Sequence, residues 1–308
     1  MSLETDLLID RRRLKRRLLL WRVVAVVAVL LCAALAVGGS KWQISGAHVA
    51  RLRISGVIGD DRQLLEAIGD VAKDDSAKAM IVEINSPGGT VGGSEALYYA
   101  IHDVAAKKPV VTVMTGVAAS GGYMAAVATQ RIWARGSTIT GSIGVLMQSM
   151  EFSDLMGKIG VSAEQLTSGP MKDQPSEFHK LSDGGRTVLR ALVMDMYDQF
   201  VEKVALGRNL DQDTVRALAD GRVYTGRQAL KVGLIDAIGD ERDARSWLAH
   251  EKQVAANLPV RAVGRRSSLA RMFAGDVGNM FGGILKTLLS QQVKFDGAYA
   301  LWQPFDTK

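Results

Sequence analysis

The sequence predicts an α/β protein in which a parallel sheet is covered by helices on both faces, preceded by one transmembrane helix. Short apolar segments of strand length alternate with segments of helical periodicity through the middle of the chain. Glycine is abundant, with 32 residues against only 6 prolines, which favours tight turns and close backbone approaches. Near the start, a stretch long enough to cross a bilayer is apolar apart from one arginine.

The composition is that of a folded protein with a large core. The chain has 308 residues, of which 47% are hydrophobic and 23% charged, enough for one large or two medium domains. These values exclude a disordered chain, a collagen and a small disulfide scaffold. Cys32 is the single cysteine, so no disulfide forms within the chain. This cysteine usage does not fix the compartment.

The positive charge is concentrated at the two ends of the chain. The net charge is +6 and the pI about 9.4, yet residues 1–22 and 241–308 hold all of the excess, and the middle is slightly acidic. A basic groove on the folded body is therefore not predicted, and nucleic acid is not an expected partner.

Residues 18–37 are predicted to form a transmembrane signal anchor. Residues 1–17 ahead of it carry a basic cluster, which the positive-inside rule places in the cytoplasm, with everything after the anchor outside. Two alternatives are weaker. A cleavable signal peptide would use the small residues at 33–39, and a buried core helix fits poorly with so basic a flank.

The middle of the chain is predicted to consist of successive strand and helix units. We assign residues 45–245 to one catalytic unit. The predicted elements are strands over 48–58, 78–84 and 109–115, helices over 61–73 and 93–106, a glycine-interrupted extended stretch over 131–146, and one long helix or two over 180–206. Residues 246–308 form a tail whose apolar residues between 269 and 289 have helical spacing. A helix docked on protein is favoured there over attachment to a membrane surface.

The segment 110–128 has the pattern of a buried strand, a tight turn and an apolar helix. Ser120 stands at the turn, followed by Gly121 and Gly122. A serine in this position can attack a carbonyl, and the Gly121 amide at the helix start can hold the developing oxyanion. The alternative is a serine that only caps the helix.

A second glycine turn, at 85–89, follows the neighbouring predicted strand. Its Asn-Ser-Pro-Gly-Gly sequence is predicted to end the strand and to leave free amides. Gly89, or less favourably Gly88, would supply a second oxyanion donor, because adjacent parallel strands end at one edge of the sheet. The alternative is an ordinary loop.

A serine nucleophile needs a base, and none of the four histidines has a convincing local setting. They are His48, His102, His179 and His250. A neutral lysine can serve instead, and Lys172, in a Gly/Pro turn after a predicted strand, is a candidate. Three other lysines compete with it: Lys158, Lys180 and Lys203.

Five segments together resemble the signal peptide peptidase A family of membrane-anchored Ser–Lys proteases, in its short form. They are Asn85–Gly89, Ala119–Tyr123, Thr140–Val145, Ser168–Asp173 and Gly221–Leu230. The resemblance covers residues 48 to 240. The Ser-Pro-Gly-Gly turn is the least specific of the five, because crotonases and Clp-type proteases share related turns.

The resemblance implies a ClpP/crotonase-like fold and a role for each matching residue. Ser120 would be the nucleophile, Lys172 the general base, and Ser142 a hydrogen-bond partner of the lysine amine. Gly89 and Gly121 would give the oxyanion amides. The resemblance also implies a homo-oligomeric ring or dome, in which the lysine can come from a neighbouring subunit.

The expected activity is that of a serine endopeptidase that degrades remnant signal peptides. The resemblance implies an extracytoplasmic catalytic domain on the bacterial inner membrane, with peptides and the lipid bilayer as partners and no cofactor or metal. Two rivals remain: a crotonase-like acyl-CoA enzyme and a non-enzymatic membrane scaffold. The cleavage preference and the subunit number are not predicted.

Overall fold

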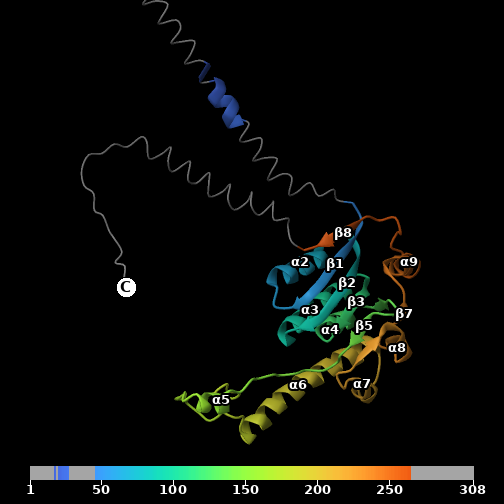
Figure 1. Ribbon diagram of the computed structural model, residues 1–308. Coiled ribbons are helices and arrows are strands. Elements are labelled where there is room, and N and C mark those ends of the chain that lie inside the picture. Colours follow the sequence, from blue (N-terminus) through green and yellow to red (C-terminus); the bar gives the residue numbers. More distant parts are fainter. Residues whose placement is uncertain (1–16, 19, 28–45, 265–308) are drawn as a thin grey trace, which may run out of the picture. The chain divides into compact units, whose positions relative to one another are not determined.

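The computed structural model describes residues 17–18, 20–27 and 46–264 (Figure 1). The chain divides into two units, residues 1–48 and residues 49–308. In the first unit, residues 17–18 and 20–27 are helical. Within these described ranges, no helix is both long and apolar enough to cross a membrane. The anchor over 18–37 and the apolar stripe of the tail fall mostly or wholly outside the described residues and stay predictions.

One sheet of eight strands organises the second unit. The path through it runs β6-β5-β3-β2-β1-β8, with β4 beside β3 and β7 beside β4. The pairs of β1 with β8, β2 with β3, β3 with β4 and β5, and β4 with β7 are parallel, whereas β5 and β6 are antiparallel. The strands are β1 (His48–Ile58), β2 (Ala77–Gly89), β3 (Val110–Ala119), β4 (Arg131–Ala134), β5 (Ile139–Gly141), β6 (Val223–Thr225), β7 (Ala237–Ile238) and β8 (Val260–Val263).

Most of the helices begin at side chains that cap them, the exceptions in the described chain being α4 and α5. Asp61, Thr90 and Ser182 each accept a hydrogen bond from a first-turn amide of the helix that follows. The predicted helices over 61–73, 93–106 and 180–206 are confirmed within a few residues, the last as one helix. The helices are α2 (Arg62–Lys73), α3 (Val91–Ala105), α4 (Gly121–Val127), α5 (Ser153–Lys158), α6 (Asp183–Arg208), α7 (Gln212–Leu218), α8 (Gly226–Lys231) and α9 (Glu241–Lys252).

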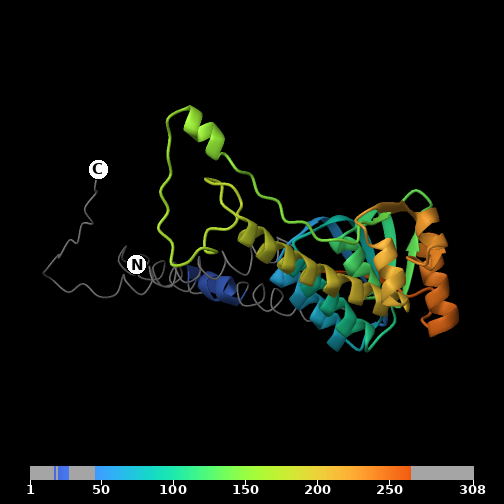
Figure 2. The same cartoon turned by 90° about the horizontal axis from the view of Figure 1, so that it is seen from below.

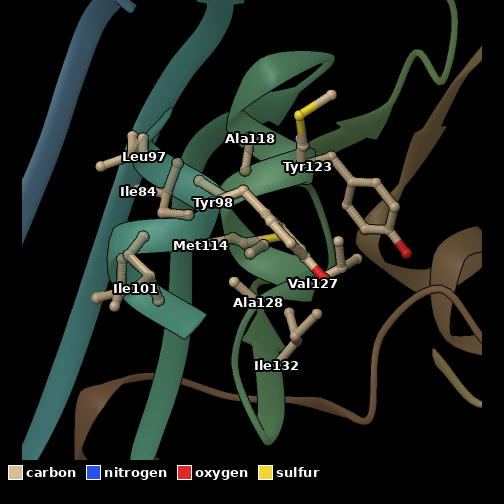
Figure 3. Packing of buried hydrophobic residues seen from close by; sticks show 14 of the residues in the cluster. Ile84, Leu97, Tyr98, Ile101, Met114, Ala118, Tyr123, Val127, Ala128 and Ile132 are labelled. Carbon is tan, nitrogen blue, oxygen red and sulfur yellow. The ribbon is translucent and has the colours of Figure 1, made fainter. Parts of the chain in front are cut away.

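The sheet buries apolar side chains on both faces, as predicted. Along β3, Val110 and Met114 join the larger cluster under the α2, α3, α4 and α6 helices, whereas Val111 and Val113 join a smaller cluster with α9. The larger cluster includes the wholly buried α4 helix and the side chains of α3 that face it (Figure 3). This packing fixes the start of α4 beside the end of β3.

The glycine turn at 85–89 differs from the prediction. It does not end the strand, because β2 stays extended through Gly89 after a register shift between Ile84 and Ser86. The Ser86 hydroxyl supports this path by donating to the Gly56 carbonyl at 2.6 Å and accepting from the Gly88 amide at 3.1 Å. The serine thus supplies side-chain hydrogen bonds in a segment where the regular ladder with β3 is shifted.

Most of the segment between β5 and α6, residues 146–181, extends away from the sheet and carries the α5 helix, and we call it the arm (Figure 2). No strand is assigned between 159 and 168, so the strand predicted before Lys172 is wrong. At the other end of the domain, α9 and β8 continue the fold, and β8 pairs with β1. The predicted boundary at residue 245 lies within α9.

Candidate active site

Ser120 has a strained backbone at the turn between β3 and α4. Its φ of 52° and ψ of −123° lie in a region that residues with a Cβ rarely adopt. The structure holds it there by two backbone hydrogen bonds, from the Ser120 amide to the Gly141 carbonyl at 2.8 Å and from the Met124 amide to the Ser120 carbonyl at 2.9 Å. The nucleophilic serine of α/β-hydrolases has a similarly strained backbone at a strand-to-helix turn.

The Ser120 hydroxyl is not used as a helix cap. Ser120 is half-buried, and its side chain makes no capping hydrogen bond to α4. The capping interpretation of this serine is therefore wrong. The amides at the start of α4, including that of Gly121, have no acceptor within the helix. A free hydroxyl and a free amide thus stand on adjacent residues.

The β2 strand brings the second glycine pair against this turn. A Cβ built on Gly88, whose φ is +101°, would lie 2.7 Å from the Gly121 nitrogen and 2.9 Å from the Ser120 Cβ. A Cβ built on Gly121 would lie 3.4 Å from the Gly89 nitrogen. The two glycine turns therefore touch, as the sequence predicts for the carboxyl ends of neighbouring parallel strands.

Gly89 is fixed from its other side by β1. A Cβ on Gly89 would lie 1.8 Å from the Ile58 carbonyl oxygen, so only glycine fits there without a shift of the backbone. The next residue, Thr90, donates its amide to the same carbonyl at 2.9 Å and caps α3. The Gly89 amide consequently stands just ahead of the positive end of a fifteen-residue helix.

Ser142 is placed beside Ser120 by strand pairing. Ala119 of β3 and Gly141 of β5 are register partners, and the two serines are the residues that follow them. Ser142 also has a positive φ, 50°, and its amide donates to the Arg222 carbonyl at 2.8 Å. The structure thus brings together four of the five predicted site residues: Ser120, Gly89, Gly121 and Ser142.

Lys172, the fifth, lies in the arm. Its side chain is exposed, and no hydrogen bond joins it to Ser120 in the described chain. The turn that carries it is held against the start of α6, because the Gln174 Oε1 accepts a hydrogen bond from the Ser182 amide at 3.1 Å. The chain therefore presents this lysine outward on a turn anchored to a long helix.

Two of the competing lysines are engaged by carboxylates. Lys203 of α6 is buried, and its Nζ donates to the Glu95 Oε1 at 2.9 Å. Burial is the largest single influence and acts to lower the pKa of Lys203, but the hydrogen bond to Glu95, the charge of Glu95 and the nearby Tyr99 together outweigh it, so the pKa is raised. The hydrogen bond with Asp154 likewise raises the pKa of Lys180. Both lysines hold their protons and are unsuited to act as a base.

The histidines are also not placed to act as the base for Ser120. All four lie in the described residues, and none is hydrogen-bonded to Ser120. His102 stacks on Tyr98 at the surface of α3, and His179 of the arm contacts the Asp173 Oδ2 at 2.6 Å. In the same described ranges, no group of histidine, cysteine and acidic side chains is placed to hold a metal ion.

Two residues of the site were not predicted from the sequence. Asn85 ties β2 to the end of β3, because its Oδ1 accepts from the Val117 amide at 3.1 Å. Ser94 lies directly behind Gly121, and its Oγ would be 2.0 Å from a Cβ on that glycine. The Gly-Gly-Ser run at 92–94 could have drawn attention to it, but nothing in the spacing connects residue 94 with residue 121.

The fold and this turn define a class of protein. A parallel α/β sheet that presents a strained serine at a strand-to-helix turn, with a second glycine turn beside it, is an arrangement that serine hydrolases use. Comparison with known proteins places the chain within that class. The pattern of peptidase family S49 matches residues 102–255, half of the chain.

Three relatives carry protease names. A Synechocystis protein named as a protease is 41% identical over 203 residues, covering 65% of this chain and 73% of its own length. An Enterococcus faecium protein named as a signal peptide peptidase SppA is 37% identical, covering 68% and 65%. The chloroplastic serine protease SPPA of Arabidopsis thaliana is 33% identical, covering 73% of this chain and 34% of its own. The chain belongs to peptidase family S49 and is a serine peptidase of the SppA type.

Proposed function

We propose that the chain is a membrane-anchored endopeptidase that hydrolyses remnant signal peptides through Ser120 and Lys172. The observation that carries this proposal is the geometry of Ser120, whose strained backbone stands at the turn where the Gly88-Gly89 and Gly121 backbones approach one another. The name of the Enterococcus relative and the family resemblance support the choice of substrate.

The chemistry follows from these groups. Neutral Lys172 takes the proton of the Ser120 hydroxyl, and the Ser120 Oγ attacks the peptide carbonyl carbon. The resulting oxyanion accepts hydrogen bonds from the Gly89 and Gly121 amides. When the peptide C–N bond breaks, Lys172 returns the proton to the leaving amine. Water then hydrolyses the acyl-enzyme, with the lysine again accepting a proton and Ser142 orienting its amine.

Lys172 would reach Ser120 from a neighbouring copy of the chain. The arm that bears it exposes an unusual number of large apolar side chains, which are Leu146, Met147, Met150, Phe152, Leu155, Ile159, Val161, Leu166, Met171 and Phe178. An apolar groove of about 460 Å³ separates the arm from α6. Surfaces of this kind mark contacts with other molecules, and a ring of copies would cover them.

The anchor and the location are part of the same proposal. Residues 18–37 would hold the protein in the bacterial inner membrane, with residues 1–17 in the cytoplasm and the peptidase domain on the extracytoplasmic side. A peptide left in the bilayer after signal cleavage would then meet the enzyme at the extracytoplasmic face of the inner membrane. The crotonase-like alternative loses support, because the family of the chain is a peptidase family.

Two substitutions test the dyad in the detergent-solubilised full chain. Ser120→Ala and Lys172→Ala should each reduce hydrolysis of an internally quenched peptide with an Ala/Leu-rich core by at least about 1,000-fold. Lys180→Ala is the matched control and should retain full activity, since Lys180 is paired with Asp154. Because the base must be neutral, kcat/KM of the unchanged protein should rise from pH 6 to pH 9. Full activity in either dyad variant would refute the assignment.

A further inference from the structure

Ser94 is a buried hydroxyl without a hydrogen-bond partner. It lies in the first turn of α3, with 1% of its surface exposed, and its Oγ has no partner in the described part of the chain. The other buried serine and threonine hydroxyls in these residues all have one, and they belong to Ser86, Thr112, Thr129, Thr138, Thr140 and Ser176. Ser94 is therefore an exception that its own environment does not explain.

The position of Ser94 connects it to the candidate oxyanion site. A Cβ on Gly121 would lie 2.0 Å from the Ser94 Oγ, 2.8 Å from its Cβ and 3.4 Å from the Gly89 nitrogen. Ser94 thus fills the space behind Gly121, on the side where Gly89 also approaches. It belongs to α3, whose capping residue Thr90 directly follows Gly89.

The first turn of α3 cannot move away from this contact easily. The Ser94 amide donates to the Thr90 carbonyl at 3.0 Å, and the Thr90 amide donates to the Ile58 carbonyl at 2.9 Å. A Cβ on Gly93 would lie 2.6 Å from the backbone of Gly59. Backbone packing therefore holds the Ser94 side chain against Gly121.

The presence of a hydroxyl group at Ser94 is not explained by a contribution to folding stability. Burying a hydroxyl without a hydrogen bond costs about 1–3 kcal/mol, and alanine would occupy the same place without that cost. The unengaged O–H dipole is free to rotate about the Cβ–Oγ bond, and it is buried, where dipoles act more strongly on a nearby charge than they do in water.

We propose that Ser94 is a positioning residue of the oxyanion site. Its side chain sets the spacing between the Gly121 and Gly89 backbones so that both amides can point at one oxygen. Its hydroxyl dipole turns toward the negative charge that develops there in the transition state. The inference rests on the proposed function, because it requires Ser120 to form a tetrahedral intermediate in this place.

Ser94→Ala tests the inference in the detergent-solubilised full chain. We expect kcat to fall about tenfold with KM changed by less than about twofold, because the effect acts on the transition state. The melting temperature should stay equal or rise. Binding of a peptide aldehyde ending in alaninal, which forms a tetrahedral adduct with a serine, should weaken by the same factor as kcat.

Thr129→Ala is the matched control. Thr129 is also a buried hydroxyl, but its Oγ1 is hydrogen-bonded to the Ala126 carbonyl at 2.8 Å and to the Thr112 hydroxyl at 3.0 Å. Its loss should lower the melting temperature and leave kcat unchanged, the opposite pattern.

The inference is overturned if Ser94→Ala keeps full kcat, or if it fails to fold, since the hydroxyl would then serve stability. An inactive Ser120→Ala beside a fully active Ser94→Ala would remove this inference and leave the proposed function intact. An active Ser120→Ala would instead remove the proposed function.

Discussion

At the scale of single residues, the site depends on positions where a side chain is either strained or excluded. Ser120 and Ser142 have positive φ angles although they are not glycines. Gly88, Gly89 and Gly121 stand where a Cβ would meet backbone or buried side-chain atoms. The strain on the two serines is balanced by the surrounding strand pairing and backbone hydrogen bonds, and it keeps the Ser120 hydroxyl free of local partners.

Gly88→Ala should show how closely the two turns fit. The added Cβ would meet the Gly121 nitrogen and the Ser120 Cβ at a φ of +101°, so the turns must separate. We expect kcat/KM to fall by about 100-fold or more and stability by about 1–3 kcal/mol, measured by peptide hydrolysis and urea unfolding. Gly92→Ala in α3, where a Cβ meets nothing within 4 Å, is the control and should change neither markedly. Equal behaviour of the two variants would contradict the account.

Some of these residues could be predicted from the sequence and others could not, for physical reasons. Ser120 and Gly121 could be predicted because a buried strand, small residues and an apolar helix follow one another directly. Ser94 could not be predicted from spacing, since its importance comes from contact with a residue on another helix. The extended course of residues 85–89 was also missed, because it depends on a hydrogen bond from Ser86 to the distant Gly56.

At the scale of elements, the strands and helices of the core were predictable and the arm was not. Apolar runs identified β3 and the first part of β2, and three-four spacing identified α2, α3 and α6. The arm has few buried residues of its own, so hydrophobic periodicity says little about its course. Its local structure rests on hydrogen bonds between polar side chains, among them the pair formed by His179 and Asp173.

The His179–Asp173 pair gives the arm a definite pH dependence. The hydrogen bond with Asp173 raises the pKa of His179 above 6.5, and the same bond lowers the pKa of Asp173. The contribution of His179 is therefore full below pH 6.5 and is lost as pH rises through its raised pKa. The contribution of Asp173 is lost as pH falls through its lowered pKa. The pair is strongest at mildly acidic pH.

An NMR titration of the imidazole protons can test this pair. In Asp173→Asn, the midpoint for His179 should move down toward 6.5, because the charged acceptor is removed. Asp154→Asn is the matched control within the arm and should leave the midpoint in place, since Asp154 is hydrogen-bonded to Lys180 instead. An unchanged midpoint in Asp173→Asn would show that the pair does not form in solution.

At the scale of the whole molecule, one chain holds both proposed dyad residues but does not join them. Ser120 lies at the carboxyl edge of the sheet, and Lys172 is exposed on the arm. Exposed apolar side chains on the arm and along α6 provide a surface for a second copy, and those on α6 are Val188, Leu192, Met194 and Leu206. We infer that the active unit is an oligomer in which neighbouring copies complete each site.

Mixing inactive variants tests this assembly. Full chains with Ser120→Ala and with Lys172→Ala should each be inactive, but a refolded equal mixture should recover about one quarter of the unchanged activity, because one site in four would combine an intact serine with an intact lysine. Mixing either variant with the double variant should recover none. If the first mixture stays inactive, the two residues do not meet across copies.

The central claim is that the Ser120 hydroxyl is the nucleophile. The most direct measurement is to treat the full chain with a fluorophosphonate, digest it, and locate the label by mass spectrometry. We predict a single labelled serine, Ser120, with labelling lost in Ser120→Ala and kept in Ser137→Ala, a control at an exposed turn. Labelling of another serine, or undiminished labelling of Ser120→Ala, would contradict the account.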